Sequence, residues 1–289
     1  MILLLAPLQI LQADTSVPDP ASTAETSVMK LGKLIFFDTR FSASGETACS
    51  SCHRPEHGFS DSTPFSLKDD GSKTRFSTPA LFDMKRKLGY FSEEPIFHLE
   101  QAVQRCMENN LDTTVLDIYV TLKKDTSLSR MSTERFGRAS AGAVFKAIAA
   151  YLNTIETSKS RFDRYRRGEM VSLTPSEQAG MVLFEQKGCV HCHAGRDMGG
   201  MVYMDGMTRA DDGAERRVQV PRLRNLSMTA PYFSDGSAAT LAEAVRRMSQ
   251  KHNATPVTEA ELEKIRLFLM SNESSISDFE GLVRYENER

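Results

Sequence analysis

The pattern Cys-x-x-Cys-His occurs twice, and it constrains this chain more than any other feature. The copies occupy residues 49–53 and 189–193 and use four of the five cysteines. In this spacing two thiols can add to the two vinyl groups of one haem, while the adjacent histidine binds its iron. The pattern therefore predicts two covalently bound c-type haems. The residues that would hold them are Cys49, Cys52, His53, Cys189, Cys192 and His193.

A cysteine pair in this spacing can also form half of a zinc site, a redox-active dithiol or a disulfide. The histidine that follows both pairs, and the lack of further cysteine pairs, favour haem over these alternatives. The fifth cysteine, Cys106, has no partner left over, and we expect it to be a small buried hydrophobic residue.

Length and charge limit what surrounds the haems. A chain of 289 residues is long enough for two domains, and a net charge of -2 gives no electrostatic case for binding nucleic acid or a membrane surface. Residues 1–13 are mostly apolar, too few to span a bilayer, and typical of the end of a secretory signal; a buried helix or strand is the alternative. With covalent haem attachment, the signal predicts a periplasmic protein.

Helical periodicity precedes or follows each motif, and no run of alternating strands is evident, so we expect an all-α fold. Thr174 begins a capping box ahead of an apolar face that ends at Gly188, and Thr258 begins another. Residues 29–36 and 140–157 are the other predicted helices. Segments 14–26, 58–79 and 195–221 are expected to be loops, and the charged run 161–167 a boundary, either a solvated linker or a docking patch.

The sixth ligand of each iron separates electron transfer from peroxide chemistry, because a second strong ligand blocks substrate. Methionine is the expected partner of a transfer centre, and Met248 lies far enough downstream to reach the opposite face of the second haem. The other candidates are Met198, Met201, Met204, Met207 and Met228. Near the first haem, residues 59–96 contain no histidine, so that site is expected to be open unless His98 closes it.

Together with the two haem motifs, the stretches at 31–38, 58–61, 77–81, 147–151, 161–163 and 220–237 resemble the bacterial di-haem cytochrome c peroxidases and their MauG-like relatives. The resemblance runs from about residue 31 to residue 272 and, after the haem motifs, is most specific over residues 220–237. It implies two cytochrome c-like helical haem domains, a peroxidatic one at 27–165 and an electron-transfer one at 166–289, after a signal remnant (1–13) and a linker (14–26). It also implies hydrogen peroxide as substrate, a small soluble donor of cytochrome c or cupredoxin type, and a homodimer.

The resemblance also assigns roles to individual residues. Met248 stands where the peroxidases place an axial methionine and MauG-like enzymes a tyrosine. Gln101 matches a distal glutamine, and Asp112 stands for the family's catalytic glutamate after a one-residue insertion. Glu108 is the weaker candidate for that role, and a solvated helix face is the alternative for both carboxylates. A calcium ion between the haems would use the backbone of Thr229 and Pro231, but Ser77 replaces the family's asparagine.

Other departures distinguish three functional hypotheses. The chain has no tryptophan, and Ser92 stands where the family has one between its haems, so Tyr90 or Phe91 is the candidate aromatic residue there. The leading hypothesis is a peroxidase. The alternatives are a MauG-like oxidase that modifies residues of a partner protein and a non-catalytic di-haem electron carrier in which both irons are blocked.

Overall fold

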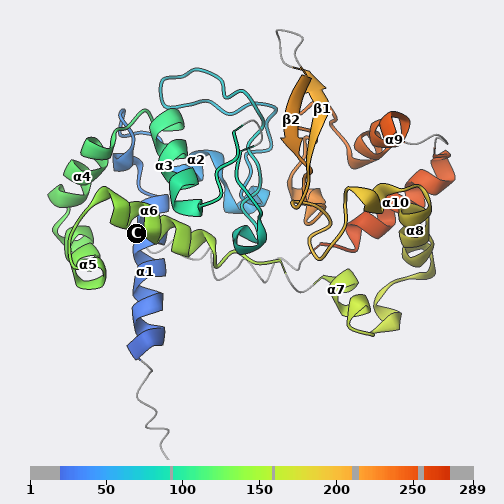
Figure 1. Ribbon diagram of the computed structural model, residues 1–289, viewed down its shortest axis with the longest axis horizontal. Helices are drawn as coiled ribbons and strands as arrows, with labels where there is room; N and C mark the ends of the chain where they lie inside the picture. Colours follow the sequence, from blue (N-terminus) through green and yellow to red (C-terminus); the bar gives the residue numbers. More distant parts are fainter. Residues whose placement is uncertain (1–19, 92–93, 158–159, 210–214, 253–256, 274–289) are drawn as a thin grey trace, which may run out of the picture.

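The computed structural model of this protein describes residues 20–91, 94–157, 160–209, 215–252 and 257–273, and its regular structure is largely helical (Figure 1). The all-α prediction is confirmed except for one two-stranded antiparallel sheet. In the part of the chain that the structure describes, no helix is both long and apolar enough to cross a membrane. The predicted signal remnant lies outside the described residues.

A first hydrophobic core gathers side chains between Val28 and Ile155. Helix α1 crosses helix α6 at Gly32, where an added Cβ would lie 1.9 Å from the carbonyl oxygen of Ala147. Only a residue without a side chain lets the two backbones approach so closely. The helices of this first unit are α1 (Pro20–Phe36), α2 (Cys49–Cys52), α3 (Leu99–Asn110), α4 (Val115–Lys124), α5 (Thr126–Phe136) and α6 (Ala141–Leu152).

A second core, between Phe162 and Leu269, repeats this arrangement. Helix α8 crosses α10 at Gly180, where an added Cβ would lie 1.9 Å from the carbonyl oxygen of Lys264. In each unit, the helix before the haem motif thus crosses the unit's last helix at a glycine, a repeat that the sequence pattern did not show. The helices of this second unit are α7 (Arg161–Arg166), α8 (Pro175–Gln186), α9 (Leu241–His252) and α10 (Glu259–Met270).

The predicted helix starts at Thr174 and Thr258 are confirmed, because both residues form capping boxes with the glutamate three positions later. Two predictions were wrong in part. Helix α1 begins at Pro20, inside the expected linker, and the charged run forms α7 rather than a solvated linker. Phe162 of α7 packs into the second core, so the cores divide a few residues before the boundary expected at 165/166.

The antiparallel sheet lies in the segment expected to be a loop. Strand β1 (Tyr203–Arg209) pairs with β2 (Glu215–Gln219), with Tyr203 opposite Gln219 and Met204 opposite Val218. These strands are rich in polar and charged residues, so they lack the apolar alternation that identifies a half-buried strand. Pairing between the two segments, rather than local periodicity, forms this sheet.

Largely buried ion pairs lie where the two units meet. Arg224 donates to both carboxylate oxygens of Asp163 at 2.6 and 2.9 Å and to the carbonyl of Thr157 at 2.7 Å. Arg86 of the first unit donates to Asp197 of the second at 2.9 Å. Pairing avoids the large free-energy cost of burying an isolated charge. The pairs also specify how the two units pack against each other. The cluster comprises Asp83, Arg86, Asp163, Asp197, Arg222 and Arg224.

Candidate haem sites

The first motif forms the short helix α2, and His53 follows at its end. The backbone N–H of His53 donates to the carbonyl of Cys49 at 2.9 Å, and its ring Nδ1 donates to the carbonyl of Phe59, also at 2.9 Å. The second bond orients the ring and holds its proton on Nδ1, which is the tautomer in which Nε2 can bind iron. Burial lowers the pKa of His53, which favours the neutral imidazole that binds metal.

The second motif holds its histidine in the same way. The backbone N–H of His193 donates to the carbonyl of Cys189 at 2.9 Å, and its ring Nδ1 donates to the carbonyl of Met198 at 3.2 Å. Phe59 and Met198 both have left-handed backbone, with φ of 57° and 51°. Neither carbonyl acceptor was predicted from the sequence. The only local signal is a glycine beside each one, Gly58 and Gly199.

The attachment residues fit haem better than the alternatives. All four motif cysteines are half-buried and none is in a disulfide. Among the described residues, no three His, Cys, Asp or Glu side chains gather as a zinc site would require. Each motif instead offers two thiols and one oriented imidazole, which is the donor set of a covalently attached haem.

The predicted distal residues share one element. Gln101 and Glu108 are both exposed and seven residues apart on α3, which places them on the same face of the helix. Glu108 accepts a hydrogen bond from Gln104 at 2.9 Å. Asp112 follows the helix end with a φ of 48°, and its side chain is exposed. The distal roles of all three stay predictions, and His98 is the exposed N-cap of the same helix.

Cys106 also lies on α3, close to the first motif. Its thiol accepts a hydrogen bond from Asn110 at 3.4 Å, and burial raises its pKa. Its charge would in turn raise the pKa of Cys49. Cys106 is half-buried by exposure, so it is less enclosed than the sequence predicted.

The structure separates the methionine candidates for the second iron. Met198 supplies its carbonyl to His193, on the side of the ring away from iron, and Met201 is 56% exposed. Met228 packs against the first core instead. Met204 lies 3.5 Å from the thiol of Cys192, and the half-buried Met248 lies on α9. Met248 stays our prediction, with Met204 as its competitor; the side chain of Met207 lies outside the described residues.

Ser77 does not present a free side chain to a cation. Its hydroxyl donates to the carbonyl of Phe233 at 3.1 Å, and its N–H donates to the carbonyl of Ser234 at 2.8 Å. These bonds join the two units directly. The side chain at the position of the family's calcium ligand thus links the two units in this structure, and the calcium ligands expected at Thr229 and Pro231 stay predictions.

Tyr90 and Phe91 have different surroundings. Tyr90 is buried and donates its hydroxyl to the carbonyl of Met84 at 3.0 Å. Phe91 is 40% exposed, and the guanidinium of Arg105 lies 5.2 Å from its ring centre. Of the two aromatic candidates, Tyr90 is thus the interior one. Ser92 lies outside the described residues.

The ammonium of Lys87 lies 5.7 Å from the ring centre of Tyr90. Burial, with a smaller contribution from Arg222, lowers the pKa of Lys87 to about 7. From pH 7 to about 10.4, the ordinary lysine value, the unfolded chain therefore holds a proton that the folded chain lacks. The free energy of unfolding should rise with pH over this window, and the cost of burying the charge is fully present below pH 7.

We expect Lys87→Met to be more stable than the wild type at pH 6, with a difference that shrinks as pH rises from 7 to 10. Urea unfolding at several pH values measures this difference. Lys85→Met, at an exposed neighbouring position, is the control and should show no such trend. A Lys87→Met difference that does not change with pH would contradict the lowered pKa.

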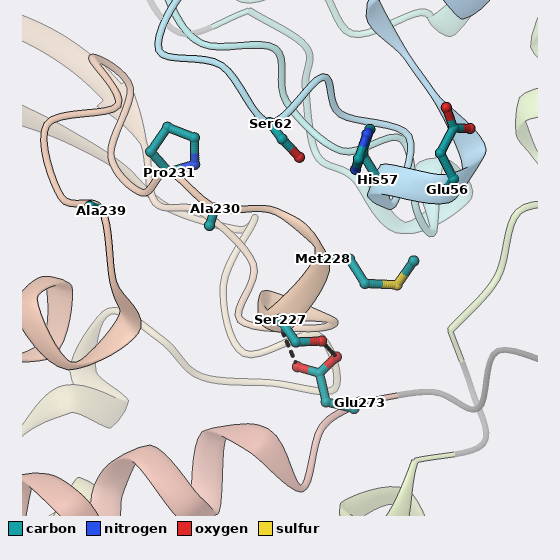
Figure 2. A pocket seen from close by; sticks show the side chains of 9 residues that line it. All are labelled: Glu56, His57, Ser62, Ser227, Met228, Ala230, Pro231, Ala239 and Glu273. Carbon is teal, nitrogen blue, oxygen red and sulfur yellow. Dashed lines mark hydrogen bonds between the residues drawn. The ribbon is translucent and has the colours of Figure 1, made fainter.

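A cavity of about 720 Å³ lies between residues 56–62 of the first unit and residues 227–239 of the second (Figure 2). Ser227 donates its N–H and hydroxyl to Glu273 at 3.1 and 2.7 Å, and burial raises the pKa of Glu273. The residues that line the cavity include two carboxylates (Glu56 and Glu273), the imidazole of His57 and the thioether of Met228. Its lining residues are Glu56, His57, Ser62, Ser227, Met228, Ala230, Pro231, Ala239 and Glu273.

Known proteins resemble this chain over nearly its whole length. It is 29% identical to the cytochrome c551 peroxidase of Nitrosomonas europaea, covering 94% of this chain and 86% of that protein. It is 24% identical to the methylamine utilization protein MauG of Methylophilus methylotrophus, covering 96% and 89%. The crystal structure of a MauG-like protein associated with microbial copper homeostasis matches with a TM-score of 0.73 at 22% identity, covering 94% and 97%. Residues 26–171 match the family described as di-haem cytochrome c peroxidase, and the chain belongs to that family.

Proposed function

We propose that this protein is a periplasmic di-haem peroxidase that reduces hydrogen peroxide to water with electrons from a small soluble donor of cytochrome c or cupredoxin type. The observation that carries the proposal is an asymmetry between two otherwise similar motifs. Each holds its histidine by a backbone carbonyl. The helical methionines after the first motif, Met107 and Met131, pack in the first core, whereas the half-buried Met248 lies on α9 after the second motif. One open centre and one closed centre are what a peroxidase fed by an electron carrier requires.

When bound, the two haems supply the one-electron chemistry of iron. His53 would hold the iron of the first haem, the centre at which peroxide would react. A carboxylate of α3 or its C-terminal end, Asp112 or Glu108, would move a proton between the peroxide oxygens, and Gln101 would hydrogen-bond the substrate. His193 and Met248 would hold the centre that receives electrons. Peroxide, two electrons and two protons then yield two water molecules.

The absorption and electron paramagnetic resonance spectra of the oxidised holoprotein, followed by peroxide turnover with an artificial donor, test this function. We expect one high-spin centre, one low-spin centre and donor oxidation that depends on peroxide. Two low-spin centres without turnover would contradict the proposal and favour the electron carrier.

A MauG-like oxidase that modifies a partner protein is the second candidate. The fold similarity to a MauG-like protein supports it, whereas methionine at position 248 and the lack of tryptophan favour the peroxidase. Steady turnover with a small donor separates the two, because an oxidase of this kind would consume peroxide efficiently only with its protein substrate.

Replacing Met248 should change the second centre alone. In Met248→Ala the iron at His193 loses its thioether ligand, so its low-spin ferric signal should be lost or altered and its reduction potential should fall. Spectroscopy and a redox titration of the holoprotein measure this. Met204→Ala is the matched control, because Met204 contacts the attachment thiol of Cys192. If Met204→Ala produces the change and Met248→Ala does not, the assignment moves to Met204.

A further inference from the structure

The loop from Phe59 to Leu67 contacts two functional groups of the first motif. At one end the carbonyl of Phe59 accepts the bond from His53 at 2.9 Å. At the other end the carbonyl of Leu67 lies 3.9 Å from the sulfur of Cys52. The loop therefore contacts both the iron-binding ring and an attachment thiol, and the side chains inside it lie next to the first haem site.

Asp61 is the charged residue inside this loop, and it is 8% exposed. Its carboxylate accepts bonds from the N–H of Thr63 at 3.2 Å, the hydroxyl of Thr63 at 2.9 Å and the hydroxyl of Ser66 at 2.5 Å. Ser66 is bonded in turn to the hydroxyl of Thr78. All three donors to Asp61 are neutral, so they orient the carboxylate without cancelling its negative charge.

Asp61 lies between the two contacts that the loop makes with the motif. It follows two residues after Phe59, whose carbonyl accepts the bond from His53. Its partner Ser66 is next to Leu67, whose carbonyl contacts the sulfur of Cys52. The site of the first haem is thus influenced by a fixed buried anion on the loop, and an interaction of this kind is only weakly screened by solvent.

We propose that Asp61 is a positioning residue that lowers the reduction potential of the iron bound by His53 and so holds that centre in its oxidised, peroxide-ready state. Oxidised iron carries one more positive charge than reduced iron, so a buried negative charge nearby favours the oxidised form. The inference rests on the proposed haem at His53. The second motif differs in its nearby buried charge, because the buried aspartate beside Met198, which supplies the corresponding carbonyl, is Asp197, whose charge is paired with Arg86 and Arg224.

A redox titration of the holoprotein, followed separately at the two haems, tests the inference with Asp61→Asn. At a fixed ambient potential, the ratio of oxidised to reduced iron at His53 should fall roughly tenfold, while the centre at His193 serves as internal reference and should not change. Asp70→Asn is the matched control, because Asp70 accepts similar bonds from Ser72 but is exposed. It should alter neither centre.

The variant Asp61→Glu separates the effect of the negative charge from the effect of a change in loop conformation. It retains the negative charge, so it should keep the first centre close to the wild-type potential even if the loop adjusts. An unchanged first centre in Asp61→Asn, an equal change at both centres, or the same change in Asp61→Glu would overturn the inference. The haem content of the wild type is measured first; a single haem per chain would instead contradict the proposed function.

Discussion

Peroxide reduction should be lost when His53 is replaced by glycine, with kcat/KM falling by at least about 100-fold. Changes in groups that merely support a metal ligand cost about 10- to 100-fold, and removing the ligand itself should cost more. Cys49 and Cys52 retain the covalent attachment, so the variant separates haem binding from iron ligation. Haem content, the absorption spectrum and peroxide turnover of the holoprotein measure these properties.

His191→Ala is the matched control for this replacement. His191 is an exposed imidazole within the second motif that does not occupy the iron-binding position, so activity should be retained. Added imidazole should partly restore His53→Gly, because the free ligand can enter the space left by the ring. Full activity in His53→Gly without imidazole would show that His53 is not the ligand of the reactive centre.

The second large effect is expected at the two helix crossings. Gly180→Ala, and likewise Gly32→Ala, should lower the free energy of unfolding by about 3 kcal/mol, at the upper end of typical overpacking costs. In each case the new Cβ would lie 1.9 Å from a carbonyl oxygen of the crossing helix, so the backbones must separate. Urea unfolding followed by circular dichroism and by haem absorbance measures the loss.

Gly142→Ala provides the control, because it makes the same substitution in a helix without a close neighbour. No atom lies within 4 Å of its added Cβ, and the position is inside α6. Alanine favours the helix, so this variant should gain up to about 1 kcal/mol. Equal effects at positions 142 and 180 would show that the crossings tolerate a side chain.

Part of the candidate site could be predicted from the sequence because the groups that attach a haem are close together in the chain. Covalent haem attachment needs only two thiols and an imidazole at a set spacing in the chain, so the candidate motifs at 49–53 and 189–193 could be recognised from the sequence. Helix starts are local as well, because a capping box uses residues only three positions apart. The starts at Thr174 and Thr258 were therefore predicted correctly.

The distal candidates show where sequence alone reaches its limit. Asp112, Glu108 and Gln101 were selected by resemblance. The structure adds that Gln101 and Glu108 share one face of α3, while Asp112 follows the helix end in a left-handed conformation. Helix periodicity could place the first two together, but it could not show how the chain turns after Asn110.

The sequence by itself indicated the two candidate haem motifs and four of the ten α-helices that the structure describes, α1, α6, α8 and α10, because these depend on neighbouring residues. Only the tertiary structure decided which carbonyls orient His53 and His193, where Asp61 is buried, how β1 pairs with β2 and which helices cross at Gly32 and Gly180. The physical reason is that the hydrogen bonds and the close packing in this second group depend on left-handed backbone and on contacts between distant segments. Neither leaves a periodic signal in the chain.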